Sequence, residues 1–165
     1  MNVARFRLRA GGRRQLWRAE AIKRIVVDAF GPAAVHAFDR HYCLFSGRRL
    51  VAFAAVQDRI VLLDGKEAAM GLVGSVTTEK SQRGGGLGRM LMEFLIDREG
   101  EAGRRLVLNC GEKVKAFYLK TGFAQIAPKA GYERGGRIEW DDDPVLALGL
   151  PPDASYGGVF IGEDF

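Results

Sequence analysis

The 165-residue chain is long enough for one domain with a full core, and its 47% hydrophobic and 27% charged residues are typical of a globular protein, not of a fibrous or disordered one. No apolar run approaches the ~20 residues of a membrane-spanning helix, and residues 1–9 lack the apolar core of a secretory signal, so we expect a cytoplasmic protein with no membrane partner.

The net charge of +5 arises in residues 1–30, which carry eight Lys and Arg against Glu20 and Asp28. We interpret these cations as the solvent faces of a strand and a helix. We expect no nucleic-acid partner, because no zinc finger or RNA-recognition motif accompanies them.

The cysteine and histidine content argues against a metal site. Cys43 and Cys110 lie far apart and match no metal-ligand spacing, and His36 and His41 are the only histidines. We therefore expect no metal and interpret both cysteines as buried thiols. Cys110 could also accept an acyl group, but no neighbouring base is visible in the sequence.

The first half of the chain predicts a strand, two helices and then antiparallel strands. A strand is expected at 3–9, ended by Gly11-Gly12, then a helix at 13–30 and a short helix at 33–39. Apolar runs predict further strands at 42–45, 50–56, 60–63, 66–70 and 71–78. Ser46-Gly47 and Asp64-Gly65 are typical turn sequences between them.

The second half predicts alternating helices and strands. An apolar stripe of Leu87, Met90, Leu91, Phe94 and Leu95 indicates a helix at 87–98, closed by Gly100 and Gly103. A buried strand at 105–110 follows and should run parallel to the strand that ends at Thr78, because a helix connects the two. We further expect a helix at 112–120 ended by Gly122, a strand at 123–126, and a strand pair at 137–140 and 145–148 around Asp141-Asp142-Asp143-Pro144. The order predicts an α/β domain over residues 1–150, with a mixed sheet between helices, and a tail over 151–165 without readable periodicity.

The segment from Ser81 to Leu91 contains a glycine-rich turn between a predicted strand and a predicted helix. Glycine permits a positive φ and a close approach of the backbone to a ligand. The first N–H groups of a helix lack intrahelical partners and lie at the positive end of the helix dipole. Together these features predict a site for an anion such as a pyrophosphate.

Three known phosphate-binding motifs can be compared with the sequence of this turn. A Walker A loop would need Lys and Ser or Thr after Gly88, but Arg89 and Met90 follow. A dinucleotide fingerprint fails in both frames, since Arg89 or Leu91 stands where the third glycine belongs. The third pattern, R/Q-x-x-G-x-G/A, is matched by Arg83-Gly84-Gly85-Gly86-Leu87-Gly88.

With this motif the chain resembles the GCN5-related N-acetyltransferase (GNAT) superfamily. The segment Ala116-Phe117-Tyr118-Leu119-Lys120-Thr121-Gly122-Phe123 is similar to a second signature of that family, at the expected distance from the turn. The resemblance implies a single-domain α/β fold with a mixed, mostly antiparallel sheet flanked by helices, and with a parallel strand pair splayed around acetyl-CoA. Dimers are common in the family, although no segment of the sequence identifies an interface.

The resemblance also implies which residues bind the acyl donor. Backbone N–H groups of the turn would hold the pyrophosphate, and the preceding strand would hold the pantetheine arm. The implied cofactor-binding residues are Val76, Thr77, Thr78, Arg83, Gly84, Gly85, Gly86, Leu87, Gly88 and Arg89, with Asn109 and Tyr118 from the later strand and helix. Arg89 could equally be a solvated arginine.

The resemblance implies N-acetyl transfer from acetyl-CoA to a primary amine of a small molecule or peptide by direct attack. Tyr118 matches the family's general acid, and a phenol of pKa ~10 suits protonation of a leaving thiolate. The strand before the turn contains no carboxylate, so the general base is open between Glu79 and Glu112. Acidic residues at Glu139 and 141–143 could attract a cationic acceptor, but a solvated acidic turn explains them as well.

Two other functions remain open at this point. The apolar, glycine-rich segment 146–165 would also suit a longer acyl chain, as in related acyltransferases of this fold. The missing strand carboxylate would also suit a CoA-binding sensor module without catalysis.

Overall fold

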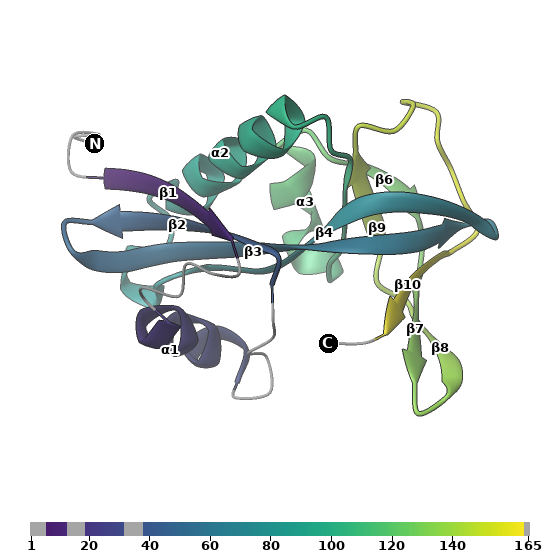
Figure 1. Cartoon of the computed structure of the whole chain (residues 1–165), viewed down its shortest axis with the longest axis horizontal. Helices are drawn as coiled ribbons and strands as arrows, with labels where there is room; N and C mark the ends of the chain where they lie inside the picture. Colours follow the sequence, from purple (N-terminus) through teal and green to yellow (C-terminus); the bar gives the residue numbers. More distant parts are fainter. Residues whose placement is uncertain (1–5, 13–18, 32–37, 164–165) are drawn as a thin grey trace. The chain divides into compact units, whose positions relative to one another are not determined.

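The computed structural model describes residues 6–12, 19–31 and 38–163 (Figure 1). The elements in chain order are β1 (Phe6–Gly12), α1 (Ala19–Phe30), β2 (Arg40–Ser46), β3 (Arg49–Leu63), β4 (Lys66–Thr78), the 3-10 helix η3 (Lys80–Gln82), α2 (Leu87–Glu101), β5 (Leu106–Asn109), α3 (Glu112–Leu119), β6 (Ala124–Ala127), β7 (Ala130–Arg134), β8 (Arg137–Asp141), β9 (Val145–Leu148) and β10 (Val159–Glu163). They form two compact units: residues 1–57 with 73–98, and residues 58–72 with 99–165. The strands β3 and β4 run through both units.

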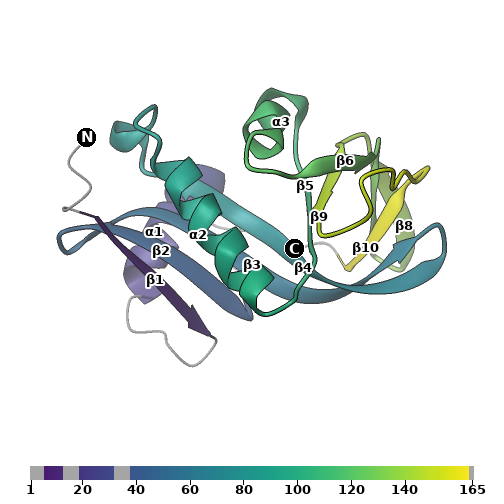
Figure 2. The same ribbon diagram turned by 90° about the horizontal axis from the view of Figure 1, so that it is seen from above.

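In the first unit, a sheet of antiparallel strands lies between two helices. β1 pairs with β2, and β2 pairs with β3. Because neighbouring residues of a strand point to opposite faces, β2 can pack against both helices. Cys43 and Phe45 pack with Ile25 and Val26 of α1, whereas Tyr42 makes an edge-to-face contact with Phe94 of α2. Figure 2 accordingly shows α2 in front of these strands and α1 behind them.

In the second unit, strands are ordered β6-β9-β5-β4 and β3-β10-β7-β8. β4 and β5 are parallel and pair at Gly71–Leu106 and Leu72–Val107, which confirms the predicted parallel pair. β10 and β7 are also parallel, while the pairs β10–β3, β5–β9, β6–β9 and β7–β8 are antiparallel. The core of this unit includes buried aliphatic residues such as Val61, Leu72 and Ile161. The predicted class, an α/β fold with a mixed, mostly antiparallel sheet, is confirmed.

Several element boundaries differ from the sequence prediction. The strands expected at 66–70 and 71–78 are one strand, β4. The strands expected at 50–56 and 60–63 are one strand, β3, because the polar residues between them alternate between half-buried and exposed positions and continue the strand. Gly11 and Gly12 do not end β1 but pair with His41 and Arg40. The helix α2 includes Gly100 and stops before Gly103, whose φ of +68° is left-handed.

The predicted pairing of strands 137–140 and 145–148 is wrong. β8 pairs with β7, which was not predicted, and β9 pairs with β5 and β6. The physical reason is burial: Val145, Leu146 and Ala147 are all buried and fit a strand between two others, whereas Arg137 to Trp140 are exposed. β10 was also not predicted, because it is a short strand in a segment rich in glycine.

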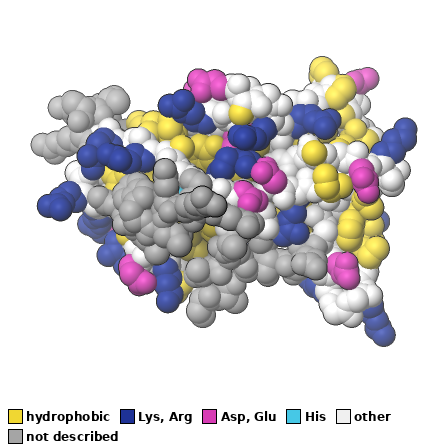
Figure 3. Space-filling model, in the orientation of Figure 1, with side chains coloured by type: hydrophobic (Ala, Val, Ile, Leu, Met, Phe, Trp, Pro, Cys, Tyr) yellow, Lys and Arg dark blue, Asp and Glu magenta, His cyan; other side chains and the backbone are white. Residues whose placement is uncertain are grey.

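Some predictions lie outside the described residues. They are the strand start before Phe6, the helix start at 13–18 and most of the short helix at 33–39. Of the basic residues near the N-terminus, Arg7, Arg9, Lys23 and Arg24 are described, and all are exposed as expected. Figure 3 shows Lys and Arg side chains over the β1–β2 region of the first unit. None of the described helices is long and apolar enough to cross a membrane.

Candidate functional site

The glycine-rich turn joins the end of β4 to α2 in the first unit. Arg83 to Gly86 are exposed, while Leu87 is 2% exposed and anchors the first turn of the helix. Gly84 and Gly86 both have a φ of +79°, a conformation that costs other residues about 1–2 kcal/mol. The turn therefore needs glycine at these two positions, and a Cβ at either would meet no protein atom within 4 Å. That free space leaves the backbone open to a ligand.

The backbone of α2 begins at this turn with unpaired donors. The N–H of Met90 donates to the carbonyl of Gly86 at 3.0 Å, so Gly86 caps the helix. The N–H groups of Leu87, Gly88 and Arg89 consequently have no intrahelical acceptor. They lie at the positive end of a helix of 15 residues. This is the arrangement that binds phosphate groups at helix N-termini.

Two arginines of the turn have partners within the protein. The Nε of Arg83 donates to the carbonyl of Thr78 at 3.0 Å and so ties the turn to the end of β4. The Nε of Arg89 donates to Glu93 at 2.7 Å, one turn along α2. Both side chains of the Arg89–Glu93 pair are more than half exposed, so opening it costs under about 1 kcal/mol. The structure thus fits the solvated-arginine interpretation of Arg89.

The strand before the turn contains a backbone irregularity that the sequence did not reveal. Ser75 has a φ of +51°, which is uncommon for a residue other than glycine. The residues Gly74, Ser75 and Val76 are all half-buried, whereas Thr77 is buried. β4 therefore changes its backbone direction just before the predicted pantetheine-binding residues Val76, Thr77 and Thr78. A glycine followed by serine inside an apolar strand was the available signal.

Glu79, a candidate general base, follows β4 directly. Its N–H donates to the carbonyl of Val51 at 2.8 Å, which extends the pairing with β3 past Thr78. Its Oε1 accepts hydrogen bonds from the Nε of Arg49 at 3.1 Å and from the Nη2 of Arg49. Its Oε2 is buried and has no hydrogen-bond partner in the described part of the chain. One oxygen is thus bound by a cation, and the other is buried without a partner among the described residues.

The other candidate residues, Asn109, Glu112 and Tyr118, lie in the second unit. Asn109 ends β5 and is half-buried. Both oxygens of Glu112 lie 2.7 Å from the Nζ of Lys115, so this carboxylate already has a cationic partner. Within this unit the structure brings Glu112 and Tyr118 onto one helix, α3.

Tyr118 is half-buried between two aromatic rings. Its ring contacts Phe117 and Phe123 edge to face, with centroid distances of 5.0 and 6.2 Å. Burial, with a smaller effect of Cys110, raises the pKa of Tyr118 to about 12. The phenol therefore keeps its proton across the physiological range and can donate it.

Cys110 contributes to the raised pKa of Tyr118, but its own thiol is not activated as a nucleophile. Burial raises the pKa of its thiol, and Asp143 and Glu112 raise it further, while Lys115 acts in the opposite direction. A thiol in this environment stays protonated, and the thiolate is the reactive form. The structure supports the interpretation of Cys110 as a buried thiol.

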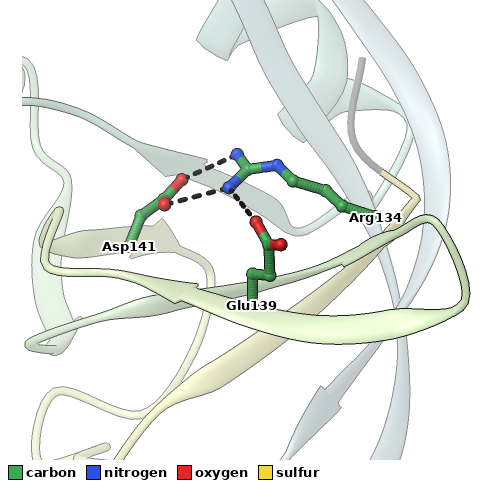
Figure 4. Close-up of polar contacts among 3 residues, drawn as sticks. All are labelled: Arg134, Glu139 and Asp141. Atoms are coloured by element: carbon green, nitrogen blue, oxygen red, sulfur yellow. Dashed lines mark hydrogen bonds and ion pairs between the residues drawn. The ribbon is translucent and has the colours of Figure 1, made fainter.

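The acidic residues at the end of β8 are partly neutralised (Figure 4). Arg134 donates to both oxygens of Asp141, at 3.1 and 2.9 Å, and to Glu139 at 3.3 Å. This pairing lowers the pKa of Asp141. Two of the four carboxylates thus have a cationic partner in the chain, which weakens the hypothesis that they attract a cationic acceptor.

A cavity of about 610 Å³ also lies in the second unit, between residues of β3, β4 and the α2–β5 loop. Its lining includes Arg59, Met70 and Arg105, and it contains none of the predicted site residues. Among the residues that the structure describes, no three His, Cys, Asp or Glu side chains form a candidate metal site.

Comparison with known proteins identifies the family. Residues 17–126, about two thirds of the chain, match the family described as acetyltransferase (GNAT) domain. A search of curated proteins gave no match. Among solved structures, the fold is similar to a GNAT family N-acetyltransferase (YhbS) from Escherichia coli in complex with CoA, with 15% identity, a TM-score of 0.68, and coverage of 95% of this chain and 89% of that one.

Two further structures have the same fold. A GNAT family acetyltransferase from Brucella melitensis in complex with acetyl-CoA has 18% identity and a TM-score of 0.60, covering 93% of this chain and 94% of that one. Escherichia coli ElaA has 16% identity and a TM-score of 0.66, covering 86% and 98%. The match over residues 17–126 shows that the chain belongs to the GNAT family of acyl-CoA N-acyltransferases.

Proposed function

We propose that the protein transfers an acetyl group from acetyl-CoA to a primary amine of a small molecule or peptide. The observation that carries this proposal is the exposed turn from Arg83 to Gly88, with two left-handed glycines and the N-terminus of α2, in a chain of the GNAT family. A diphosphate accepts hydrogen bonds from such N–H groups without a metal. Two proteins of similar fold were solved with CoA and with acetyl-CoA, which supports the same donor here.

In this proposal, the turn and β4 share the binding of the donor. The N–H groups of residues 84–89 hold the pyrophosphate, with Arg83 anchoring the turn to Thr78. The backbone of Val76, Thr77 and Thr78 pairs with the pantetheine arm, as the family resemblance implies, and Asn109 contributes from β5.

The reaction needs one proton removed and one supplied. The amine nitrogen attacks the thioester carbon, an N–C bond forms, the C–S bond breaks, and CoA leaves as a thiolate. Tyr118, whose pKa is about 12, donates a proton to that sulfur. Glu79 accepts the proton of the amine by way of a water molecule, because its Oε2 is buried and its Oε1 is bound by Arg49. Glu79 is favoured over Glu112 because Lys115 occupies both oxygens of Glu112.

A thiol-release assay tests the proposal. The protein is incubated with acetyl-CoA and a panel of small amines and peptides, and free CoA is measured. We expect release that depends on one class of amine. A parallel series with long-chain acyl-CoA tests the transfer of longer acyl groups. Binding of CoA without release for any amine or donor would contradict catalysis and indicate a CoA-binding sensor.

Tyr118→Phe is expected to lower the turnover number while leaving CoA affinity within a few-fold, because only the proton donor is lost. General acid catalysis contributes about 10²–10⁴-fold in such reactions. Tyr156→Phe is the matched control, since Tyr156 is a partly buried tyrosine of the same unit that packs on the core. An unchanged rate in Tyr118→Phe would refute the assignment of the acid.

A further inference from the structure

Among the residues that the structure describes, the strand β8 forms an edge of the sheet in the second unit. It is last in the order β3-β10-β7-β8, and it pairs with β7 along its whole length. Four of its five residues are exposed, and two are large and apolar: Ile138 is 60% exposed and Trp140 is 46% exposed. Figure 1 shows the β7–β8 hairpin with β8 on its outer side. An edge strand with exposed apolar residues is a template for pairing with another chain.

The hairpin geometry determines which backbone groups point outward from β8. Its turn consists of Gly135 and Gly136, both with positive φ, and the flanking pair is Arg134 with Arg137. In such a two-residue hairpin the flanking pair is hydrogen-bonded, and bonded and non-bonded pairs then alternate along the strands. The N–H and C=O groups of Ile138 and Trp140 therefore point away from β7.

The charges of the hairpin are arranged so that β8 would be complementary to β8 of a second copy running antiparallel to it. The cation Arg137 begins β8, and Arg134, the last residue of β7, lies opposite it across the turn. The anions Glu139 and Asp141 lie toward the end of β8. Figure 4 shows Arg134, Glu139 and Asp141 in contact on one face. Charged residues usually protect an edge strand from pairing. Here, an antiparallel copy would bring each basic half next to an acidic half.

We propose that two copies of the chain associate through β8, as antiparallel neighbours related by a two-fold axis at Glu139. This register places Arg137 opposite Asp141 of the second copy and Ile138 opposite Trp140 of the second copy. It also makes the Ile138–Trp140 pair a hydrogen-bonded one, in agreement with the outward direction of their backbone groups. The two copies of Glu139 face each other, and each lies 3.3 Å from its own Arg134, which offsets their repulsion.

Trp140 supplies a fixed apolar contact for this interface. A Cβ at Gly131 would lie 3.0 Å from its ring, and one at Gly158 would lie 2.6 Å away, so the ring rests directly on the backbone of both glycines. The Nζ of Lys129 lies 4.8 Å from the ring centroid. The side chain is thus held in one orientation while half of it remains exposed. A rigid, partly exposed tryptophan is typical of residues that dominate binding energy.

The first test is the oligomeric state of the full chain by sedimentation equilibrium at micromolar concentration. We expect a dimer for the wild type and for Ile60→Arg, and a monomer for Ile138→Arg. Ile60 is the matched control because it is 55% exposed and also lies on a strand of the second unit. Circular dichroism verifies that both variants are folded. A monomeric wild type, or a dimeric Ile138→Arg variant, would overturn the proposal.

The second test is the register. Glu139→Cys is expected to form a disulfide-linked dimer under mild oxidation, because a directly opposed, non-bonded pair has a Cα separation of about 4.5 Å, within disulfide range. Ile138→Cys lies opposite Trp140 and should not link to itself. The native Cys43 and Cys110 are buried and do not compete. Cross-linking of Ile138→Cys but not of Glu139→Cys would contradict the two-fold axis at Glu139.

Discussion

Glu79 and Tyr118 are the proposed general base and general acid. In the structure, each has surroundings that distinguish it from other glutamates and tyrosines of the chain. For Glu79 these surroundings include Arg49, which binds one carboxylate oxygen and leaves the other without a hydrogen-bond partner in the described chain. For Tyr118 they are an apolar environment, which raises its pKa to about 12. The two residues can therefore be tested separately.

Glu79→Gln is expected to lower kcat by about 10²-fold or more if the carboxylate removes the amine proton. The amide keeps the shape and the hydrogen bond from Arg49 but is not a base, so CoA affinity should stay unchanged. Glu112→Gln is expected to reduce the rate less, because Lys115 already binds both oxygens of that residue. Steady-state kinetics of both variants measures this. A larger loss in Glu112→Gln would reverse the assignment.

Tyr118 should also make stability depend on pH in the alkaline range. Its folded pKa of about 12 lies above the ordinary value of 10, so folding favours the protonated phenol. This contribution is fully present below about pH 10 and is lost as the pH rises to about 12, by roughly 2–3 kcal/mol. Urea unfolding at several alkaline pH values should show a steeper loss in the wild type than in Tyr118→Phe. Equal slopes would contradict the buried phenol.

At the residue scale, the sequence predicted site residues that belong to local motifs and missed contacts between distant segments. Spacing and resemblance predicted the turn from Arg83 to Gly88 and Tyr118 as site residues, and these remain predictions. The partners Arg49 and Glu79 are separated by 30 residues, so no local pattern reveals the pair. For Ser75, the only local signal of its left-handed φ was the glycine that precedes it inside an apolar strand.

At the scale of elements, the turn before α2 and the hairpin β7–β8 both depend on glycine, for different reasons. Gly84 and Gly86 are needed for their positive φ, with no atom close to a potential Cβ. Gly158, which precedes β10, is needed because Trp140 of β8 covers it. The second case gives a direct test of how β8 packs against the start of β10.

Gly158→Ala is expected to destabilise the protein by about 1–3 kcal/mol, because its Cβ would lie 2.6 Å from the ring of Trp140 and force it to move. Gly157→Ala is the matched control, since a Cβ there meets nothing within 4 Å. Thermal unfolding gives the stability difference, and tryptophan fluorescence reports the displacement of the ring. Equal melting temperatures for the two variants would contradict the packing of Trp140 on Gly158.

Sequence patterns located the helices better than the strand pairings. Helix α2 follows from its apolar stripe, and the Asp64-Gly65 turn followed from its composition and has the expected positive φ at both residues. The partner of β9 could not be predicted, because β9 lies between β5 and β6 and its nearest strand in sequence, β8, pairs elsewhere. Strand pairing over long sequence separation depends on the tertiary core, which local composition does not encode.

At the scale of the whole molecule, the predicted site residues are divided between two compact units. The turn and Glu79 belong to the first unit, and Asn109, Glu112 and Tyr118 belong to the second. β3 and β4 run through both units and connect them covalently. Because the chain belongs to the GNAT family, we expect an acyl-CoA donor to bind at the turn. The thiol-release assay with a panel of amines is the experiment that identifies the acyl acceptor.

The most direct test of the account is isothermal titration of CoA into the wild type, Gly86→Ala and Gly47→Ala. Gly47 is a matched control: it is in the same unit, has a φ of +60° and has no protein atom near a potential Cβ. Both substitutions cost a similar backbone strain, about 1–2 kcal/mol. We expect CoA to bind the wild type and Gly47→Ala alike, and Gly86→Ala at least ten-fold more weakly. No binding to the wild type, or equal affinity in all three proteins, would contradict the assignment of this turn to the pyrophosphate of CoA.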